Sequence, residues 1–149
     1  MKHLTYVLAF LCLTVGVPAL PGHDAQQPKV ERQKHDPKKV KELMHNKLEN
    51  AQKILEALAM NDLDKTAKHA DALIKISKEA EWVVFKTPVY ERNSEDFRRS
   101  LEALGKQAKE KNLEGAKLTY LEMTLTCFHC HRYVRDVGMV CTDESNSSR

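Results

Sequence analysis

The chain has 149 residues, of which 30% are charged and 6% aromatic, and its formal net charge is +3. One domain is expected for this length, and five glycines and five prolines are few for the frequent turns of a β-sandwich or barrel. Because 24 basic side chains nearly balance 21 acidic ones, the charge gives no reason to expect nucleic-acid binding. Four cysteines are too few for a disulfide scaffold, so their positions carry the information.

Residues 1–19 have the pattern of a secretory signal peptide. Lys2 precedes an apolar run from Leu4 to Val15, and the small residues Val17 and Ala19 occupy the −3 and −1 positions of a possible cleavage point after Ala19. The run is shorter than the roughly 20 residues that span a bilayer, so a membrane anchor is the less favoured reading. We expect an exported protein in an oxidising compartment, with no membrane span in the mature chain.

Residues 20–35 are polar and contain two prolines, which predicts a flexible leader. The first helix should begin at Asp36-Pro37, an N-cap followed by proline, and should end at Asn61-Asp62. Apolar residues at helical spacing predict its inner face: Val40, Met44, Leu48, Ala51, Leu55 and Leu58. The second helix should follow directly, with an inner face at Leu63, Ala67, Ala70, Leu73 or Ile74, Ser77, Ala80 and Val84.

A loop is expected over residues 86–93, and Ser94 is expected to cap a third helix. Its inner face would be Phe97, Leu101, Leu104 and Ala108, and it would end near Asn112. The fourth helix should carry Leu113, Ala116, Tyr120, Thr124, Cys127, Phe128, His131 and Val134 or Arg135 on its inner face. Residues 138–149 read as a polar, disordered tail. The expected fold is therefore all-α, an antiparallel four-helix bundle over residues 36–137.

The most informative motif is Cys127-Phe128-His129-Cys130-His131, the C-x-x-C-H attachment signature of c-type haem. Cysteines three residues apart lie on one side of a helix, so both thiols can add to vinyl groups along one edge of a porphyrin. The adjacent histidine can then supply an axial ligand to the iron. Three other readings stay open: a zinc site, a thioredoxin-like redox pair and a structural disulfide between the two cysteines.

Together, the export signal, the four helices and a single C-x-x-C-H in the last helix resemble the class II c-type cytochromes, the cytochrome c′ family with its low-spin relatives. The resemblance covers residues 36–137. It implies a periplasmic protein whose bundle encloses one covalent haem c, with Cys127 and Cys130 as attachment points and His131 as an axial ligand. It also implies redox partner proteins, and homodimers that pair through their first helices.

In low-spin members of the family, a methionine from the first helix closes the distal face of the haem, and Met44 matches that position. A methionine there could instead be a core residue without a ligand role. His45 points off the apolar stripe, and Met60, Met123 and Met139 are less suitably placed. A basic residue four positions after the ligand histidine is common in the family. Arg135 occupies it and could pair with a haem propionate.

With His131 and Met44 as ligands, the iron would have no free position, which predicts an electron carrier and not an enzyme. If Met44 does not bind the iron, a five-coordinate protein that binds nitric oxide or carbon monoxide becomes the alternative. A haem-free exported helical binding module with a Cys127–Cys130 disulfide is a second alternative. The aromatic residues Trp82, Phe85 and Tyr90 are expected to serve core packing.

Overall fold

The computed structural model describes residue 30 and residues 32–147, with side chains described as far as Gly138. The expected signal peptide, residues 1–19, lies outside the described residues. Within the described part, the chain is helical and contains no β-strand. Its elements are α1 (Pro37–Ala59), α2 (Leu63–Ile76), the short 3-10 helix η1 (Ala80–Trp82), α3 (Pro88–Lys109) and α4 (Leu113–Ser147).

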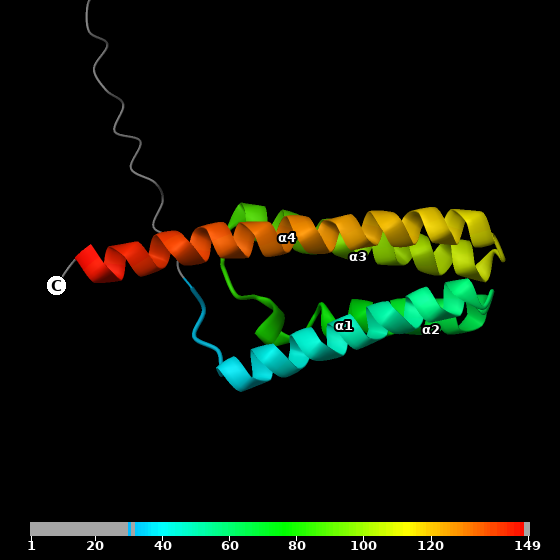
Figure 1. The fold of residues 1–149 in the computed structure, drawn as a ribbon, viewed down its shortest axis with the longest axis horizontal. Helices are drawn as coiled ribbons and strands as arrows, with labels where there is room; N and C mark the ends of the chain where they lie inside the picture. Colours follow the sequence, from blue (N-terminus) through cyan, green and yellow to red (C-terminus); the bar gives the residue numbers. More distant parts are fainter. Residues whose placement is uncertain (1–29, 31, 148–149) are drawn as a thin grey trace, which may run out of the picture.

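Successive helices run in opposite directions along the long axis of the molecule (Figure 1). The α1–α2 and α3–α4 turns lie at one end, and the connection that contains η1 lies at the other. α1 packs on α2, α2 on α3 and α3 on α4, whereas α1 approaches α4 over only a short length. The expectation of an all-α fold with packed helices is confirmed, and the bundle is open between its first and last helices.

Both helical hairpins turn at a residue with left-handed backbone, where φ is 56° at Asn61 and 58° at Lys111. Polar side chains then cap the next helix, because the Asp62 carboxylate accepts from the Lys65 amide and the Asn112 side chain accepts from the Gly115 amide. These polar pairs satisfy amides that have no partner inside the helix. The expected ends of the first and third helices are confirmed to within a few residues.

The core is densest where α2, α3 and η1 meet. Leu73, Leu101 and Leu104 are fully buried there, and the expected inner face of α3 is confirmed. The rings of Trp82 and Phe97 stack with centroids 5.3 Å apart. Phe85 and Tyr90 are buried beside them, so the expected role of the aromatic cluster in packing is confirmed. Burying one such side chain contributes about 1.5–3 kcal/mol to stability.

The expected boundary between the second and third helices was wrong. α2 ends at Ile76, and the chain then turns so that Trp82 can enter the core. α3 begins at Pro88, where the Thr87 side chain accepts a hydrogen bond from the Tyr90 amide at 3.1 Å. Ser94 is not a cap but a buried hydroxyl inside α3, which accepts from the Trp82 indole and donates to the Tyr90 carbonyl, both at 2.9 Å.

The inner faces of the outer two helices also need correction. On α1, Leu48 and Leu55 are 56% and 54% exposed, and Leu43 and Ile54 are buried in their place. On α4, Phe128 is 65% exposed, and His131 is exposed as well. Leu48 and Leu55 lie on the side of α1 that faces away from α2. Only α4 could cover this side. Because α4 stands apart from α1 over much of their length, these side chains stay accessible.

The two flanking segments also differ from expectation. The end of the expected leader is held against the α2–α3 connection: the Gln33 amide donates to the Val84 carbonyl at 2.8 Å, and the His35 ring lies 2.8 Å from the Val83 carbonyl. At the other end, α4 continues to Ser147 through much of the expected tail. Gly138 weakens a helix by only about 1 kcal/mol, so it does not stop α4. Among the described helices, none is both long and apolar enough to cross a membrane.

Candidate cofactor site

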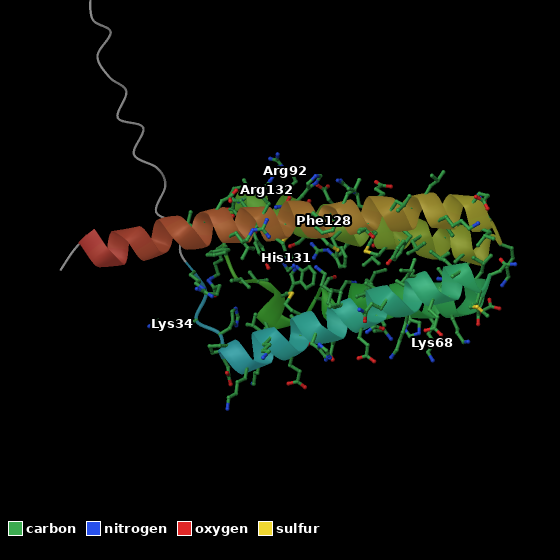
Figure 2. The ribbon with its side chains drawn as sticks, in the orientation of Figure 1. Lys34, Lys68, Arg92, Phe128, His131 and Arg132 are labelled. Carbon is green, nitrogen blue, oxygen red and sulfur yellow. The ribbon has the colours of Figure 1, made fainter. Side chains whose placement is uncertain are left out.

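The C-x-x-C-H motif lies in the middle of α4 and presents its sulfur atoms to the interior. Cys127 and Cys130 are half-buried free thiols, as their spacing of three residues on a helix predicts. His131, on the following position, lies on the side of α4 that faces α1 (Figure 2). Cys127 and His131 of the motif therefore face the opening between the first and last helices, whereas Cys130 packs against the core.

A cavity of about 380 Å³ occupies this opening. Its volume lies within the range of small-molecule and cofactor sites. Its lining comes from α1 and α4 and is mostly apolar: Lys41, Met44, His45, Lys47, Leu48, Ala51, Cys127 and His131. The structure thus brings Met44 to the same cavity as Cys127 and His131, which no local pattern in the sequence requires.

The ionisable groups of the motif are shifted by their surroundings. Burial raises the pKa values of the Cys127 and Cys130 thiols, and the Lys47 cation opposes this shift. The protein displaces part of the water around the His131 ring, and this partial burial lowers the pKa of His131. The cations of Lys47 and Arg135 add to the lowering. The site therefore favours neutral imidazole and neutral thiols, and a neutral imidazole can bind a metal.

Sequence reasoning missed Lys47, which is buried to 7% exposure on α1, one turn after Met44. Its Nζ lies 4.7 Å from the ring centroid of Trp82 and 4.5 Å from that of Phe97, so the aromatic faces stabilise the cation. No described carboxylate forms an ion pair with it. The available signal was its position on the face that carries Leu43 and Ile54, but a lysine is rarely expected there.

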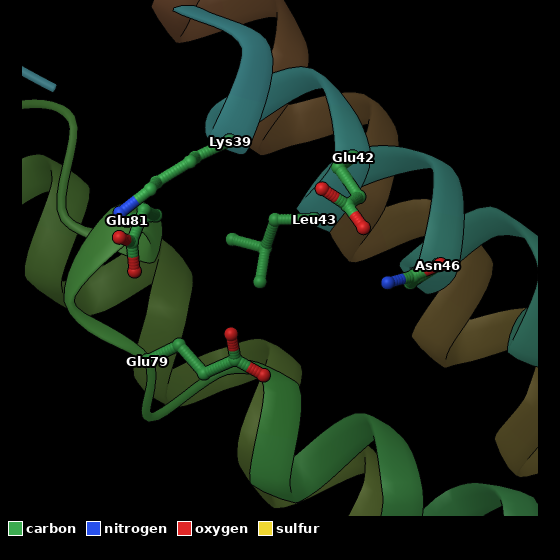
Figure 3. A pocket seen from close by; sticks show the side chains of 6 residues that line it. All are labelled: Lys39, Glu42, Leu43, Asn46, Glu79 and Glu81. Carbon is green, nitrogen blue, oxygen red and sulfur yellow. The ribbon is translucent and has the colours of Figure 1, made fainter. Parts of the chain in front are cut away.

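Two further pockets lie nearby. One pocket of about 640 Å³ also contacts Met44. It is lined by the segment before α1, by the first turns of α1 and by the α2–α3 connection: Arg32, Gln33, Lys34, His35, Pro37, Val40, Lys41, Met44 and Val84. Another of about 300 Å³ lies between α1 and the α2–α3 connection (Figure 3). Its lining is mainly charged and includes no residue of the motif: Lys39, Glu42, Leu43, Asn46, Glu79 and Glu81.

The remaining candidate residues are spread around the site. Arg135 is exposed on α4, close enough to influence His131. His45 is exposed and contributes to the cavity lining. Met123 is buried in α4 with its Sδ 4.0 Å from the Cys127 sulfur, and Met60 is 75% exposed after α1. The side chain of Met139 lies outside the described side chains.

Two hydrogen bonds fix the walls of the site. The Tyr120 hydroxyl donates to the Ala51 carbonyl at 3.2 Å and ties α4 to α1 about two turns before the motif. The hydroxyls of Tyr133 and Thr87 lie 2.7 Å apart and tie α4 to the start of α3 just after the motif. α4 is thus held on both sides of the motif, so its orientation toward α1 is defined.

The other chemistries considered for the cysteines find little support in this arrangement. In the part of the chain that the structure describes, no group of three or more His, Cys, Asp and Glu side chains is placed to hold a metal ion, so a four-ligand zinc site lacks its ligands. The two thiols also lie mid-helix, and not at the helix N-terminus that a thioredoxin-like pair uses. Comparison with family models, with curated proteins and with solved structures finds no match to this chain.

Proposed function

We propose that this protein is an exported c-type cytochrome that carries single electrons by means of one covalently attached haem. The observation that carries the proposal is the cavity between α1 and α4, which gathers Cys127 and His131 of the C-x-x-C-H motif and places Met44 on the opposite wall. The apolar lining and the donor set of sulfur and imidazole suit a haem, and the volume lies within the general range of cofactor sites. A periplasmic location follows from this proposal and the expected signal peptide.

Different residues of the chain would attach the haem, bind its iron and pair with its propionates. Each thiol of Cys127 and Cys130 would add its sulfur and its hydrogen across one vinyl double bond of the haem, so that two thioethers form and nothing is released. His131 would supply a neutral imidazole nitrogen from α4, and Met44 would supply a thioether sulfur from α1. Arg135, exposed near His131, is the residue we propose for pairing with a propionate.

Haem iron supplies a one-electron couple when it is bound. The residues around it favour electron transfer over bond-making chemistry. Met44, as a second ligand from α1, would leave the iron no free position for a substrate. Leu48 and Ala51 would give the group an apolar wall on the α1 side. We therefore propose a carrier that exchanges electrons with redox partner proteins and performs no catalysis of its own.

Met44 decides between a carrier and a gas-binding protein, and its role is testable by spectroscopy. We expect the protein purified after export from a host with c-type maturation to be low-spin in the ferric state. Met44→Ala should become high-spin and should bind carbon monoxide when reduced. Met123→Ala is the matched control, since Met123 lies on α4 beside Cys127, and it should stay low-spin. A Met44→Ala protein with an unchanged spectrum would show that Met44 is not a ligand.

A further inference from the structure

The outer side of α4 carries four large apolar side chains in a row. Leu118 is 69% exposed, Leu121 59%, Leu125 56% and Phe128 65%. The cavity lining described above includes none of them. Scattered exposed apolar residues are common on protein surfaces, but a contiguous row is typical of an interaction site. We name these four residues the α4 seam.

The spacing of the α4 seam is that of a helix-pairing surface. Its members are separated by three, four and three residues, the a and d positions of a heptad repeat. Over the ten residues from the first to the last, a helix rises about 15 Å. A row of this length suits a second straight helix lying alongside. The α4 seam is also symmetric, since reversing the chain direction gives the same spacing.

The charges at the two ends of the α4 seam select the direction of that second helix. Glu114 lies one turn before Leu118, where it also pairs with Lys117 at 2.7 Å, and Arg132 lies one turn after Phe128; both are exposed. They are 18 residues apart, which is five helical turns, so they lie on the same line as the seam. An identical helix in antiparallel orientation places each Glu114 opposite an Arg132. A parallel one would place like charges together.

We propose that two copies of this chain pair through the α4 seam, antiparallel and about a two-fold axis. Leu121 of each copy lies against Leu125 of the other, and Leu118 lies against Phe128. Such an interface is isologous, with the same patch used by both copies, and it closes after two. This surface differs from the first-helix pairing that the family resemblance implies. It rests only on side chains outside the cavity and does not depend on the haem.

The pairing is tested by sedimentation velocity on the full exported chain over a range of concentrations. The wild-type protein should be a dimer, and Leu125→Glu should weaken its association by more than about tenfold. Leu55→Glu on α1 is the matched control, because Leu55 has nearly the same exposure as Leu125, and it should leave the dimer unchanged. Circular dichroism should show native helix content in both variants. A monomeric wild type, or a dimer that only Leu55→Glu disrupts, would overturn the proposal.

A charge exchange tests the antiparallel direction. Glu114→Arg and Arg132→Glu should each weaken the dimer, and the double variant should restore most of the lost affinity. Glu122 lies beside the middle of the seam, so the two-fold axis brings two copies of it together, and Glu122→Gln should tighten the dimer. If the double variant is weaker than either single variant, the helices do not pair in this way.

The failure of this proposal can be told apart from the failure of the proposed function. The double variant Cys127→Ser with Cys130→Ser cannot attach haem, and it should still dimerise with the same concentration dependence. A dimer that is lost in this variant would show that association depends on the haem and not on the α4 seam.

Discussion

Lys47 is a buried cation in the wall of the candidate haem cavity, held over the rings of Trp82 and Phe97. A positive charge near the iron disfavours the ferric state, which carries one more positive charge than the ferrous state. Lys47→Met keeps the length and apolar stem of the side chain and removes the charge. We expect this variant to lower the midpoint potential by tens of millivolts in a potentiometric titration, as Coulomb's law gives at short range.

The matched control for Lys47 is Lys53 on the same helix. Lys53 is exposed and pairs with Glu49 at 2.6 Å, so solvent screens it. Lys53→Met should leave the midpoint potential nearly unchanged. Equal shifts in the two variants would mean that overall charge, and not the buried position of Lys47, sets the effect.

Tyr90 should make the stability of the fold depend on alkaline pH. Burial raises its pKa to about 12, and its hydroxyl donates to the Trp82 carbonyl. The unfolded chain releases this proton near pH 10, whereas the folded chain retains it. Stability is therefore full below about pH 10 and is lost between pH 10 and 12, by about 2–3 kcal/mol.

Tyr90→Phe tests this origin of the pH dependence. It should cost about 1 kcal/mol at neutral pH through loss of the hydrogen bond to Trp82. Urea unfolding followed by circular dichroism should then show a flatter decline in the free energy of unfolding above pH 10 than in the wild type. A decline of the same steepness would assign the effect to other groups.

At the scale of helices, a capping side chain followed by proline begins two helices, and the sequence-based expectation is right for one of them. Asp36-Pro37 and Thr87-Pro88 are both a capping side chain followed by proline at the first helical position, and both begin a helix. The sequence-based expectation places the second pair in a loop and the cap of the third helix at Ser94. The indole of Trp82, which lies five residues before Thr87 in η1, donates to the Ser94 hydroxyl instead.

Thr87 should matter to stability more than an ordinary cap. Its hydroxyl accepts from the Tyr90 amide and lies 2.7 Å from the Tyr133 hydroxyl of α4. Thr87→Ala removes both interactions and should lower the free energy of unfolding by about 2 kcal/mol, near the upper end for N-caps. Thr87→Ser keeps the hydroxyl and should lower it much less in the same chemical denaturation experiment. Equal losses would assign the effect to the methyl group.

The face that α1 buries could not be read from the sequence. The helical period fits two stripes, one through Met44, Ala51 and Leu55 and one through Leu43, Lys47 and Ile54. Residue type favours the first, because the second contains a lysine. Which stripe is buried depends on where α4 lies, and α4 leaves the first stripe beside a cavity.

At the scale of the molecule, the predictable part of the site is the part encoded locally. Cys127, Cys130 and His131 follow from spacing within one helix, and Cys127 and His131 line the same cavity. Met44 and Cys127 are 83 residues apart in the chain. Whether they line one cavity therefore depends on how α1 and α4 are placed relative to each other. The family resemblance implied it, and periodicity alone did not. The cavity itself and the burial of Lys47 depend on the open side of the bundle, which no sequence pattern describes.

The covalent attachment of haem is the central claim, and acid–acetone extraction of the exported protein tests it most directly. Thioether bonds survive this treatment, so the red colour should stay with the protein precipitate, in an amount equal to one haem per chain by its absorbance. The Cys127→Ser, Cys130→Ser variant should release any colour to the solvent. A wild-type protein that is colourless, or whose colour passes into the acetone, would contradict the account.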